Sequence, residues 1–315
     1  MNAELANFWQ NLQRVASEVL SKEVPPKCKV AYFDYPVNSN VGDLLIWMGT
    51  EKWIEKNNYS VICRTNINDG HFPNLDPDTI ILCQGGGNFG DLYKHQQYRE
   101  KIVLTYPNNK IIFLPQTIYY QNPRNLIKTA NVLKEHQNLV LYLRDDRSLE
   151  IAKVNFKEAR LYSCPDMATF LYPMNLISAK SNSFKNIFLM RKDIEKSSHE
   201  PSIPVGSWVG DWKTITGSEA LLIKAFQLLN FTLFRFFSAK VTFLIWSKLA
   251  TQIVMKSANH FIAADHVTTS RLHGHILALL LEKPVTLIDN NYGKNKLYYQ
   301  KWHKDCDLVT MGNSL

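Results

Sequence analysis

Short apolar segments alternate with longer segments of helical period along the first half of the chain. The longer segments include 43–57 and 123–137, where apolar residues recur every three or four positions. The short β-prone segments are 28–35, 60–64, 79–84, 110–115, 139–144 and 159–164. This order predicts repeated strand-helix-strand units, which form a mostly parallel sheet with helices on both faces. Ligands of such sheets bind beyond the carboxyl ends of the strands.

A second block follows a polar connection, rich in serine and asparagine, at 176–186. β-prone segments at 186–191 and 284–289 belong to this block. A chain of 315 residues can bury two hydrophobic cores of ordinary size. We therefore predict an α/β fold with two domains, 1–175 and 176–315, facing each other across a cleft.

Charge and composition narrow the range of partners. The chain has 36 Lys and Arg against 28 Asp and Glu, a net charge of +8, which favours phosphorylated small molecules, acidic lipid or nucleic acid. It lacks zinc-finger spacing, an RNA-recognition signature and a dense basic run, so we expect no nucleic-acid partner. The 5 cysteines include no pair separated by two residues, which predicts reduced thiols and no metal site. The first residues do not resemble a secretory signal, so we expect the chain in the cytoplasm.

Two loops after strands contain residues suited to ligand binding. The loop at 35–47 passes Asn40 and enters a helix at Asp43, although either residue could act only as a helix cap. The loop at 84–93, "QGGGNFGDLY", has three consecutive glycines that would let backbone amides approach a ligand, or would only form a tight turn. It lacks the Lys-Ser/Thr of a Walker loop and the full G-x-G-x-x-G spacing. An ATPase or a dinucleotide-binding enzyme is therefore disfavoured.

Arginines stand at the ends of two predicted strands. Arg144 ends the segment 139–144, and Arg191 repeats the pattern in the second block. A strand-end arginine can bind a carboxylate or phosphate with two hydrogen bonds. The alternative for Arg144 is a surface ion pair with Asp145 or Asp146.

The segment "TTSRLHGHILALLLEKP" at 268–284 combines basic residues with a leucine-rich helix. Ser270 is the predicted N-cap, which puts Arg271 and His273 in the first helical turn. The free amides of that turn attract an anion, and a histidine beside them is suited to proton transfer. His275 points elsewhere, so we assign it a structural or secondary role.

Seven segments together resemble one family. These are "NVGDLLI", "QGGGNFGDLY", "LPQTI", "RDDRS", "CPDMA", "TTSRLHGHILALLLEKP" and "DNNYGK", and their order is similar to that in the polysaccharide pyruvyl transferases, especially the exopolysaccharide type. The resemblance implies two Rossmann-like domains similar to those of GT-B glycosyltransferases. It also implies transfer of a pyruvyl group from phosphoenolpyruvate to two hydroxyls of a sugar as a ketal, without a metal or redox cofactor.

The resemblance also implies roles for the basic residues. Arg271 and His273 match the family's residues for donor binding and catalysis, and Arg144 matches its donor arginine, with Arg147 close enough to compete. The predicted donor-binding residues are Arg144, Arg191, Arg271, Leu272 and His273. Phosphoenolpyruvate carries a carboxylate and a phosphate, which arginines and a helix N-terminus suit. Ketal formation needs a proton on the methylene carbon, and a histidine is the natural acid near neutral pH.

The acceptor sugar is expected against the first domain, where amide and carboxylate side chains follow the strands. The predicted acceptor-binding residues are Asn40, Asp43, Gly86, Gly87, Asn88, Asp91, Gln116 and Lys294. Polysaccharide repeat units are usually built on a lipid carrier at the inner face of the membrane, so the expected acceptor is a lipid-linked oligosaccharide.

One stretch, 220–246, is unusually apolar and its only charges are positive. We favour a buried helix and strand there over an amphipathic surface resting on an anionic membrane. A variant with serine at Phe231, Phe234 and Phe237 would separate the two.

Two other classes of function remain open at this stage. One is a GT-B-like glycosyltransferase that uses a nucleotide sugar, and the other is a non-catalytic relative that binds a sugar or an anion. Stabilisation by phosphoenolpyruvate against a panel of nucleotide sugars would distinguish them.

Overall fold

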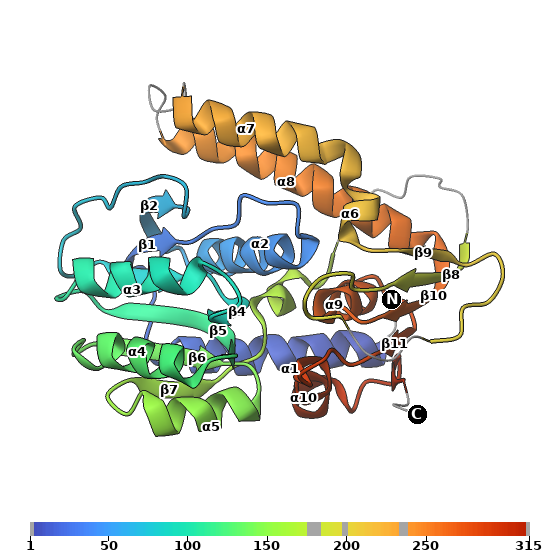
Figure 1. Ribbon diagram of the computed structural model, residues 1–315, viewed down its shortest axis with the longest axis horizontal. Coiled ribbons are helices and arrows are strands. Elements are labelled where there is room, and N and C mark those ends of the chain that lie inside the picture. Colours follow the sequence, from blue (N-terminus) through green and yellow to red (C-terminus); the bar gives the residue numbers. More distant parts are fainter. Residues whose placement is uncertain (1–2, 175–183, 197–200, 233–238, 313–315) are drawn as a thin grey trace.

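The computed structural model describes residues 3–174, 184–196, 201–232 and 239–312, and its strands form two parallel sheets (Figure 1). The first sheet has 7 strands in the order β2-β1-β3-β5-β6-β7, with β4 paired to β5. Its strands are β1 Lys29–Phe33, β2 Ser60–Thr65, β3 Ile80–Cys83, β4 Gly86–Gly90, β5 Ile111–Tyr119, β6 Leu139–Leu143 and β7 Arg160–Ser163. Its helices are α2 Val41–Lys56, α3 His95–Thr105, α4 Pro123–Lys134 and α5 Asp146–Asn155, followed by the 3₁₀ helix η1 Met167–Leu171. The predicted alternation of strands and helices is confirmed here.

The second sheet has 5 strands in the order β12-β11-β10-β8-β9. Its strands are β8 Phe184–Leu189, β9 Trp208–Gly210, β10 Ala264–Thr269, β11 Val285–Leu287 and β12 Val309–Met311. Its helices are α6 Trp212–Ile215, α7 Ala220–Thr232, α8 Ala239–Ile262, α9 Leu272–Leu280 and α10 Lys294–Tyr298, with a π-helical turn at Tyr299–His303. The predicted polar connection at 176–186 lies mostly outside the described residues.

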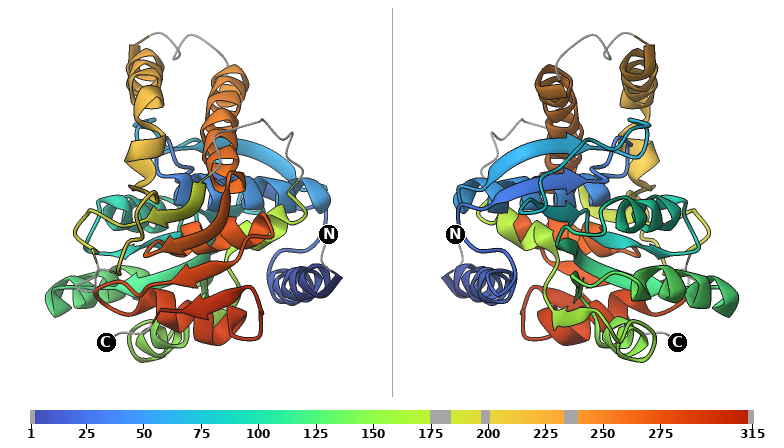
Figure 2. Two further views of the ribbon diagram at one scale, coloured as in Figure 1. Left: turned by 90° about the vertical axis from the view of Figure 1, so that its right-hand side faces the viewer. Right: turned by 90° about the vertical axis from the view of Figure 1, so that its left-hand side faces the viewer.

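The first sheet is buried on both faces. Along β1, Val30 and Tyr32 belong to one core cluster, whereas Ala31 and Phe33 belong to the other, as expected for a strand whose side chains alternate. The second of these clusters lies under α3, α4 and α5. The first continues through α2 and the N-terminal helix α1 Ala3–Leu20 to α9 of the second sheet (Figure 2). Helix α2 is therefore packed between the two sheets, where it contacts η1, α8 and α9.

The glycine-rich segment differs from its prediction as a loop. Gly86–Gly90 forms strand β4, in which Gly86 pairs with Gln116 of β5 and Phe89 pairs with Ile118. Gly90 has a φ of 149°, and a Cβ there would lie 1.7 Å from the carbonyl oxygen of Tyr119. The glycines thus let two strands of the same sheet approach each other.

The apolar stretch 220–246 also differs from its prediction as a helix and a strand. It forms helix α7 and the first turns of helix α8, while 233–238 lie outside the described residues. The two helices stand up from the body of the molecule (Figure 2). Among the described residues, no helix has the length and apolar character needed to span a membrane.

The start of α9 lies one residue later than predicted. Arg271 is the N-cap, and its amide donates to the Thr269 hydroxyl at 3.0 Å. The Ser270 hydroxyl instead accepts from the amide of Arg191 at 2.8 Å. Strand β10 ends at Thr269 and strand β8 at Leu189, so this hydrogen bond links the segments that follow the two strands. Ser270 therefore does not cap the helix.

Candidate active site

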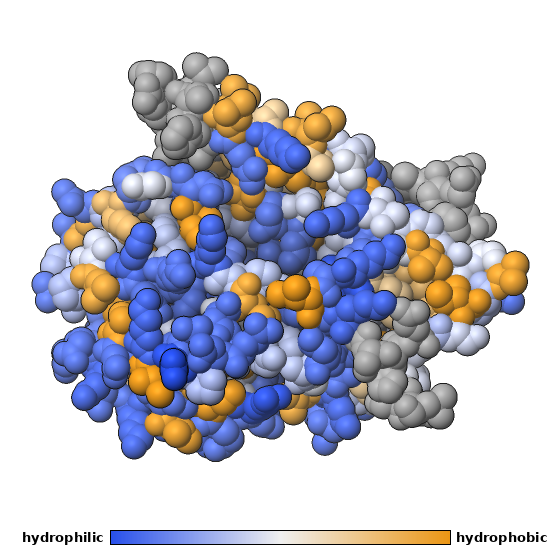
Figure 3. All heavy atoms as spheres, in the orientation of Figure 1, coloured by the Kyte–Doolittle hydropathy of each residue, from blue (hydrophilic) through white to orange (hydrophobic). Residues whose placement is uncertain are grey.

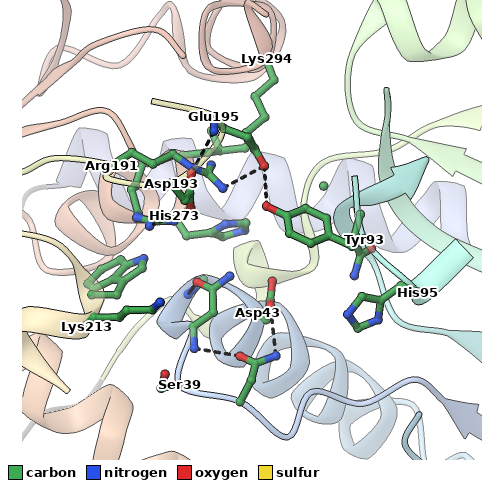
Figure 4. Close-up of a pocket in the computed structure, with 18 of the residues that line it drawn as sticks. Ser39, Asp43, Tyr93, His95, Arg191, Asp193, Glu195, Lys213, His273 and Lys294 are labelled. Atoms are coloured by element: carbon green, nitrogen blue, oxygen red, sulfur yellow. Dashed lines mark hydrogen bonds and ion pairs between the residues drawn. The ribbon is translucent and has the colours of Figure 1, made fainter. Parts of the chain in front are cut away.

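A pocket of about 330 Å³ lies between the two sheets, at the carboxyl ends of their strands. Residues that follow strands of the first sheet form one wall: Asn38, Ser39, Asn40, Gly42, Asp43, Gly87, Asn88, Tyr93, His95 and Arg144. Residues of the second sheet form the other: Arg191, Asp193, Glu195, Trp212, Lys213, Arg271, Leu272, His273 and Lys294. Figure 4 shows Arg191, Glu195 and Lys294 gathered on one side of the pocket, and Ser39 and Asp43 on the opposite side. The five predicted donor-binding residues therefore come together from distant parts of the chain.

His273 is held by a buried carboxylate. Its Nε2 lies 3.2 Å from Oδ2 of Asp166, which is fully buried and also accepts from Arg144 Nη1 at 2.5 Å. Burial alone would raise the pKa of Asp166, but His273 and Arg144 outweigh it and hold that pKa well below its usual range. Asp166 thus stays ionised, and it ties together a histidine from one sheet and an arginine from the other.

Gly42 leaves room for the His273 ring. A Cβ at Gly42 would lie 2.9 Å from Nδ1 of His273, closer than atoms of this kind normally approach. Asn40, two residues earlier, caps α2 by accepting from the amide of Gly42 at 3.1 Å. The cap and the glycine together bring the N-terminus of α2 directly against the first turn of α9.

Arg144 is the first residue after β6 and is almost completely buried. Its Nε donates to the Thr117 hydroxyl at 2.8 Å, so its guanidinium is fixed between that hydroxyl and Asp166. The predicted alternative, a surface pair with Asp145, does not occur, since Asp145 accepts from the amide of Ser148 and caps α5. Arg147 is exposed, lies outside the pocket and donates to the carbonyl of Tyr292.

Arg271 and Arg191 are each paired with carboxylates. Arg271 donates to both oxygens of Asp211, at 2.5 and 2.6 Å, and to Asp193 at 3.2 Å. Arg191 contacts Asp193 at 2.6 Å and Glu195 at 2.9 Å. Despite the effect of burial, the two arginines lower the pKa of Asp193 to about 2. The second-sheet wall therefore consists of alternating charges, not of an unbroken positive surface.

Lys294 is the most strongly perturbed cation of the pocket. It forms an ion pair with Glu195, and Tyr93 and Tyr292 each donate to the same carboxylate at 3.0 Å. Burial, and next the charge of Arg191, lower the pKa of Lys294 to about 7, although Glu195 opposes them. The charge of Lys294 is therefore sensitive to any further anion in the pocket.

A second histidine lies on the first-sheet wall. Nδ1 of His95 is 2.9 Å from Oδ1 of Asp34, and the guanidinium of buried Arg99 lies 3.2 Å from the other oxygen. Burial lowers the pKa of His95, but Asp34 outweighs it and the net shift is upward. Arg99 also donates to the side-chain oxygen of Asn88 at 2.7 Å, which fixes the orientation of that amide.

Three of the predicted acceptor-binding residues do not line the pocket. Asp91 accepts from the backbone amides of Gln121 and Asn122 and so stabilises the turn into α4. Gln116 is fully buried and donates to the carbonyl of Gln84 at 2.6 Å. Gly86 faces Ile46 and is part of the β4 pairing. The other five, Asn40, Asp43, Gly87, Asn88 and Lys294, line the pocket as expected.

His275, for which we expected a structural or secondary role, does not line the pocket. It is fully buried, and its Nε2 is 2.6 Å from Nδ1 of His303. Among the described residues, no group of three or more His, Cys, Asp or Glu side chains is arranged to hold a metal ion. The 5 cysteines are free thiols, three of them buried.

Local sequence did not reveal the carboxylates that organise the pocket. Asp166 and Asp211 are 22 and 60 positions away from Arg144 and Arg271, the arginines they bind, whereas Asp193 and Glu195 closely follow their partner Arg191. "CPDMA" was part of the family resemblance, and this was the only signal for Asp166. Nothing in the sequence distinguishes Asp211 from an ordinary helix cap, a role that it also fills for α6.

The fold and the pocket define an α/β protein that brings arginines, a lysine and two histidines from its two sheets together around one pocket. The family described as polysaccharide pyruvyl transferase matches residues 40–292. The chain therefore belongs to the polysaccharide pyruvyl transferase family, and it is a transferase.

Individual relatives agree with this assignment. The chain is 40% identical over 285 residues to the Bacillus subtilis (strain 168) protein named "Putative pyruvyl transferase EpsO", a match that covers 89% of this chain and 87% of the relative. It is 28% identical to "Pyruvyl transferase 1" of Schizosaccharomyces pombe, which covers 89% of this chain and 71% of that protein. A crystal structure of a functionally uncharacterised Klebsiella pneumoniae protein has a TM-score of 0.57 at 19% identity, covering 99% of this chain and 100% of that one. This last likeness concerns the fold alone.

Proposed function

We propose that this protein transfers the pyruvyl group of phosphoenolpyruvate to two hydroxyls of one sugar in a polysaccharide repeat unit, forming a ketal and releasing phosphate. The observation that carries the proposal is the arrangement around Asp166. This carboxylate contacts a histidine and an arginine, and both line a pocket that also contains Arg191, Arg271 and Lys294. A binding site for a compact donor with two anionic groups, and an acid within reach of that donor, are what the reaction needs.

The donor would bind against the second-sheet wall and reach Arg144 on the first-sheet wall. Its phosphate and carboxylate suit Arg144, Arg191 and Arg271, since each guanidinium has more N–H groups than its carboxylate partners occupy. The pairing with Asp193 and Asp211 fixes these side chains in advance and prevents the empty pocket from holding uncompensated charge. The backbone around Leu272, at the start of α9, adds the positive end of a helix dipole.

Proton transfer to the donor is assigned to His273. Protonation of the methylene carbon makes the central carbon electrophilic, and a sugar hydroxyl adds to it and gives up its proton. The carbon–oxygen bond to phosphate then breaks, and the second hydroxyl closes the ketal with loss of its own proton. Asp166 is a positioning residue here, because it contacts Nε2 of His273 and holds the ring.

The acceptor would lie against the first-sheet wall. Asn40, Asp43 and Asn88 offer hydrogen bonds to sugar hydroxyls, and Gly87 lets the sugar approach Arg144 and Lys294. His95, held by Asp34, is suited to accept the proton of the attacking hydroxyl. His273 and His95 would then serve the donor and the acceptor, respectively.

Under this proposal the pocket is the cleft between two domains, 1–175 and 176–315. This arrangement is similar to that in GT-B glycosyltransferases. No metal or redox cofactor takes part in the proposed reaction. The expected acceptor is a lipid-linked oligosaccharide, so we place the protein in the cytoplasm near the inner face of the membrane.

Ligand-induced stabilisation tests the donor assignment. The melting temperature of the purified protein would be measured with phosphoenolpyruvate, inorganic phosphate, pyruvate and a panel of nucleotide sugars. We expect phosphoenolpyruvate to stabilise most, because it alone supplies both anionic groups on one carbon skeleton. Stronger stabilisation by a nucleotide sugar would support a glycosyltransferase and overturn the proposal.

A further inference from the structure

The outward faces of α7 and α8 carry a cluster of exposed aliphatic side chains. The exposed fractions are 75% for Leu221, 55% for Leu222, 37% for Leu229, 51% for Leu244 and 42% for Ile245. Figure 3 shows hydrophobic side chains along the same edge of the molecule, over α7 and α8. A contiguous apolar surface of this kind on a folded protein marks an interaction site more often than isolated exposed leucines do.

These exposed residues are not part of an incomplete core. At 100° per residue, Leu221, Leu222 and Leu229 lie on one face of α7, and the buried Ile223 and Phe226 lie on the face next to it. The ring of Phe226 packs on that of Trp246 of α8, with centroids 5.3 Å apart. The apolar side of α7 thus extends beyond the part that packs on α8 and includes exposed leucines, whereas an ordinary surface helix buries its apolar stripe.

All the Asp, Glu, Lys and Arg residues within α7 and α8 are positively charged ones. Lys224, Lys240 and Lys248 are exposed on the same two helices. No Asp or Glu occurs between positions 220 and 264. A second copy of this chain bound across a twofold axis would bring these lysines against their own equivalents, which is unfavourable. A membrane that contains anionic lipid has an apolar interior for the aliphatic side chains and negatively charged headgroups for the lysines. It therefore complements the face in both respects.

The helix pair is also connected to the acceptor wall of the pocket. Gln227 of α7 donates to the carbonyl of Val37 at 2.8 Å, one residue before the pocket-lining Asn38. The ring of Phe243 of α8 contacts those of Tyr35 and Trp47. Docking through α7 and α8 would therefore bring the bound surface close to the wall where the acceptor is expected.

We propose that Leu221, Leu222, Leu229, Leu244 and Ile245, with Lys224, Lys240 and Lys248, form a docking surface for a membrane containing anionic lipid. The aliphatic side chains enter the boundary between headgroups and acyl chains, and the lysines contact the headgroups. The protein lies on the membrane and does not span it. This goes beyond the proposed function, because the surface would bind lipid whether or not the pocket transfers a pyruvyl group.

Vesicle sedimentation tests the proposal directly. The full-length protein would be mixed with vesicles of phosphatidylcholine and phosphatidylglycerol, and separately with vesicles of phosphatidylcholine alone. We expect strong binding only to the mixed vesicles. Replacing Lys224, Lys240 and Lys248 with Gln should weaken it by roughly fivefold per lysine, on the order of 100-fold together. A Leu221, Leu229, Leu244→Ser variant should also lose most binding, because its lysines have no apolar anchor.

Matched controls come from helices on another part of the surface. The exposed aliphatic residues chosen from α3, α4 and α5 are Leu104, Ile127 and Val154. The exposed lysines chosen nearby are Lys128, Lys134 and Lys157. The corresponding triple Ser and triple Gln variants should bind the mixed vesicles like the wild type. Circular dichroism and thermal unfolding would establish that every variant is folded.

Three outcomes would overturn the docking surface. The first is no binding of the wild type to mixed vesicles, and the second is binding of the folded α7 and α8 variants as strong as that of the controls. The third is a wild-type dimer, seen by sedimentation velocity without lipid, that the leucine variant converts to a monomer, which would assign the face to a second copy. Because none of these measurements depends on turnover, failure here would leave the proposed transfer reaction unaffected.

Discussion

The start of α9 and the glycine-rich segment at 84–93 were both identified as ligand-binding elements by the same argument, yet they occupy quite different positions. Both follow strands at the carboxyl edge of a parallel sheet. The first delivers Arg271 and His273 into the pocket. Of the second, Gly87, Asn88 and Tyr93 reach the pocket, while Gly86 and Gly90 serve the pairing of β4 with β5.

The difference teaches what glycine can and cannot indicate. Three glycines after a strand show that something approaches the backbone closely, but a neighbouring strand satisfies that condition as well as a ligand does. A guanidinium and an imidazole in the first turn of a helix are more specific, because burying them requires partners. At α9 these partners are Asp211 and Asp166. Substitutions at the two elements should therefore have opposite effects on turnover and on stability.

The largest expected effect on turnover is at the histidine. His273→Gln should lower kcat by about 10²- to 10⁴-fold, because it removes the acid that protonates the donor. Asp166→Asn should also lower kcat strongly, since the ring loses its charged partner. Steady-state phosphate release would measure both. Asp91→Asn, in the glycine-rich segment, is the control and should keep near wild-type kcat; a comparable loss there would remove the distinction between the two elements.

The next largest expected effect is on donor binding, and it distinguishes Arg271 from Arg147. Arg271→Lys should raise KM for phosphoenolpyruvate about tenfold or more, because an ammonium cannot reproduce the two-pronged geometry of the guanidinium. Arg147→Lys should leave KM unchanged, as Arg147 lies outside the pocket. Initial rates at varied donor concentration would measure KM. Equal changes in the two variants would mean that the pocket does not bind the donor as proposed.

A pair of glycine substitutions separates catalysis from folding. Gly42→Ala should lower kcat about tenfold to hundredfold with little change in melting temperature, because its Cβ would displace the His273 ring. Gly90→Ala should instead destabilise the fold by about 3 kcal/mol or more, because its Cβ would collide with the Tyr119 carbonyl. Denaturant unfolding and kcat would be measured for both. The comparison fails if Gly42→Ala is fully active.

The smallest expected effect is the uptake of a proton by Lys294 when the donor binds. Its pKa of about 7 lies below its usual 10.5, so the side chain is mostly neutral at pH 8 in the empty pocket. A bound anion favours the charged form and raises that pKa, so donor binding at pH 8 should take up a large fraction of one proton. Calorimetry in two buffers with different ionisation enthalpies would measure it. Lys294→Arg should bind the donor without this uptake, whereas unchanged uptake would assign the proton elsewhere.

The positions of the strands and helices along the first sheet's part of the chain were largely predictable, because apolar periodicity reports directly on burial. Strand β4 was missed because Gly86, Gly87 and Gly90 carry no side chain that favours a strand. The first turns of α8 were missed because "VTFLIW" is β-branched and aromatic, and tertiary packing on α2 and α7 overrides that local preference. In both cases, contacts distant in sequence decided the structure.

The site was predictable only for residues with conspicuous chemistry. Arg144, Arg191, Arg271 and His273 were identified because basic residues at strand ends are few. Their partners Asp166, Asp193, Glu195 and Asp211 could not be identified, because a carboxylate in a loop is more often a cap or a solvated surface group. The His95–Asp34 pair was missed for the same reason, since the two are 61 positions apart.

The most direct test of the central claim is to incubate the protein with phosphoenolpyruvate and a preparation of lipid-linked repeat units, and to follow phosphate and the mass of the acceptor together. The account predicts phosphate release that requires the acceptor, and an acceptor whose mass increases by that of pyruvic acid less one water. It also predicts that neither occurs with the folded His273→Gln variant. Release of phosphate without any change in the acceptor, or modification of the acceptor by a nucleotide sugar in the absence of phosphoenolpyruvate, would contradict it.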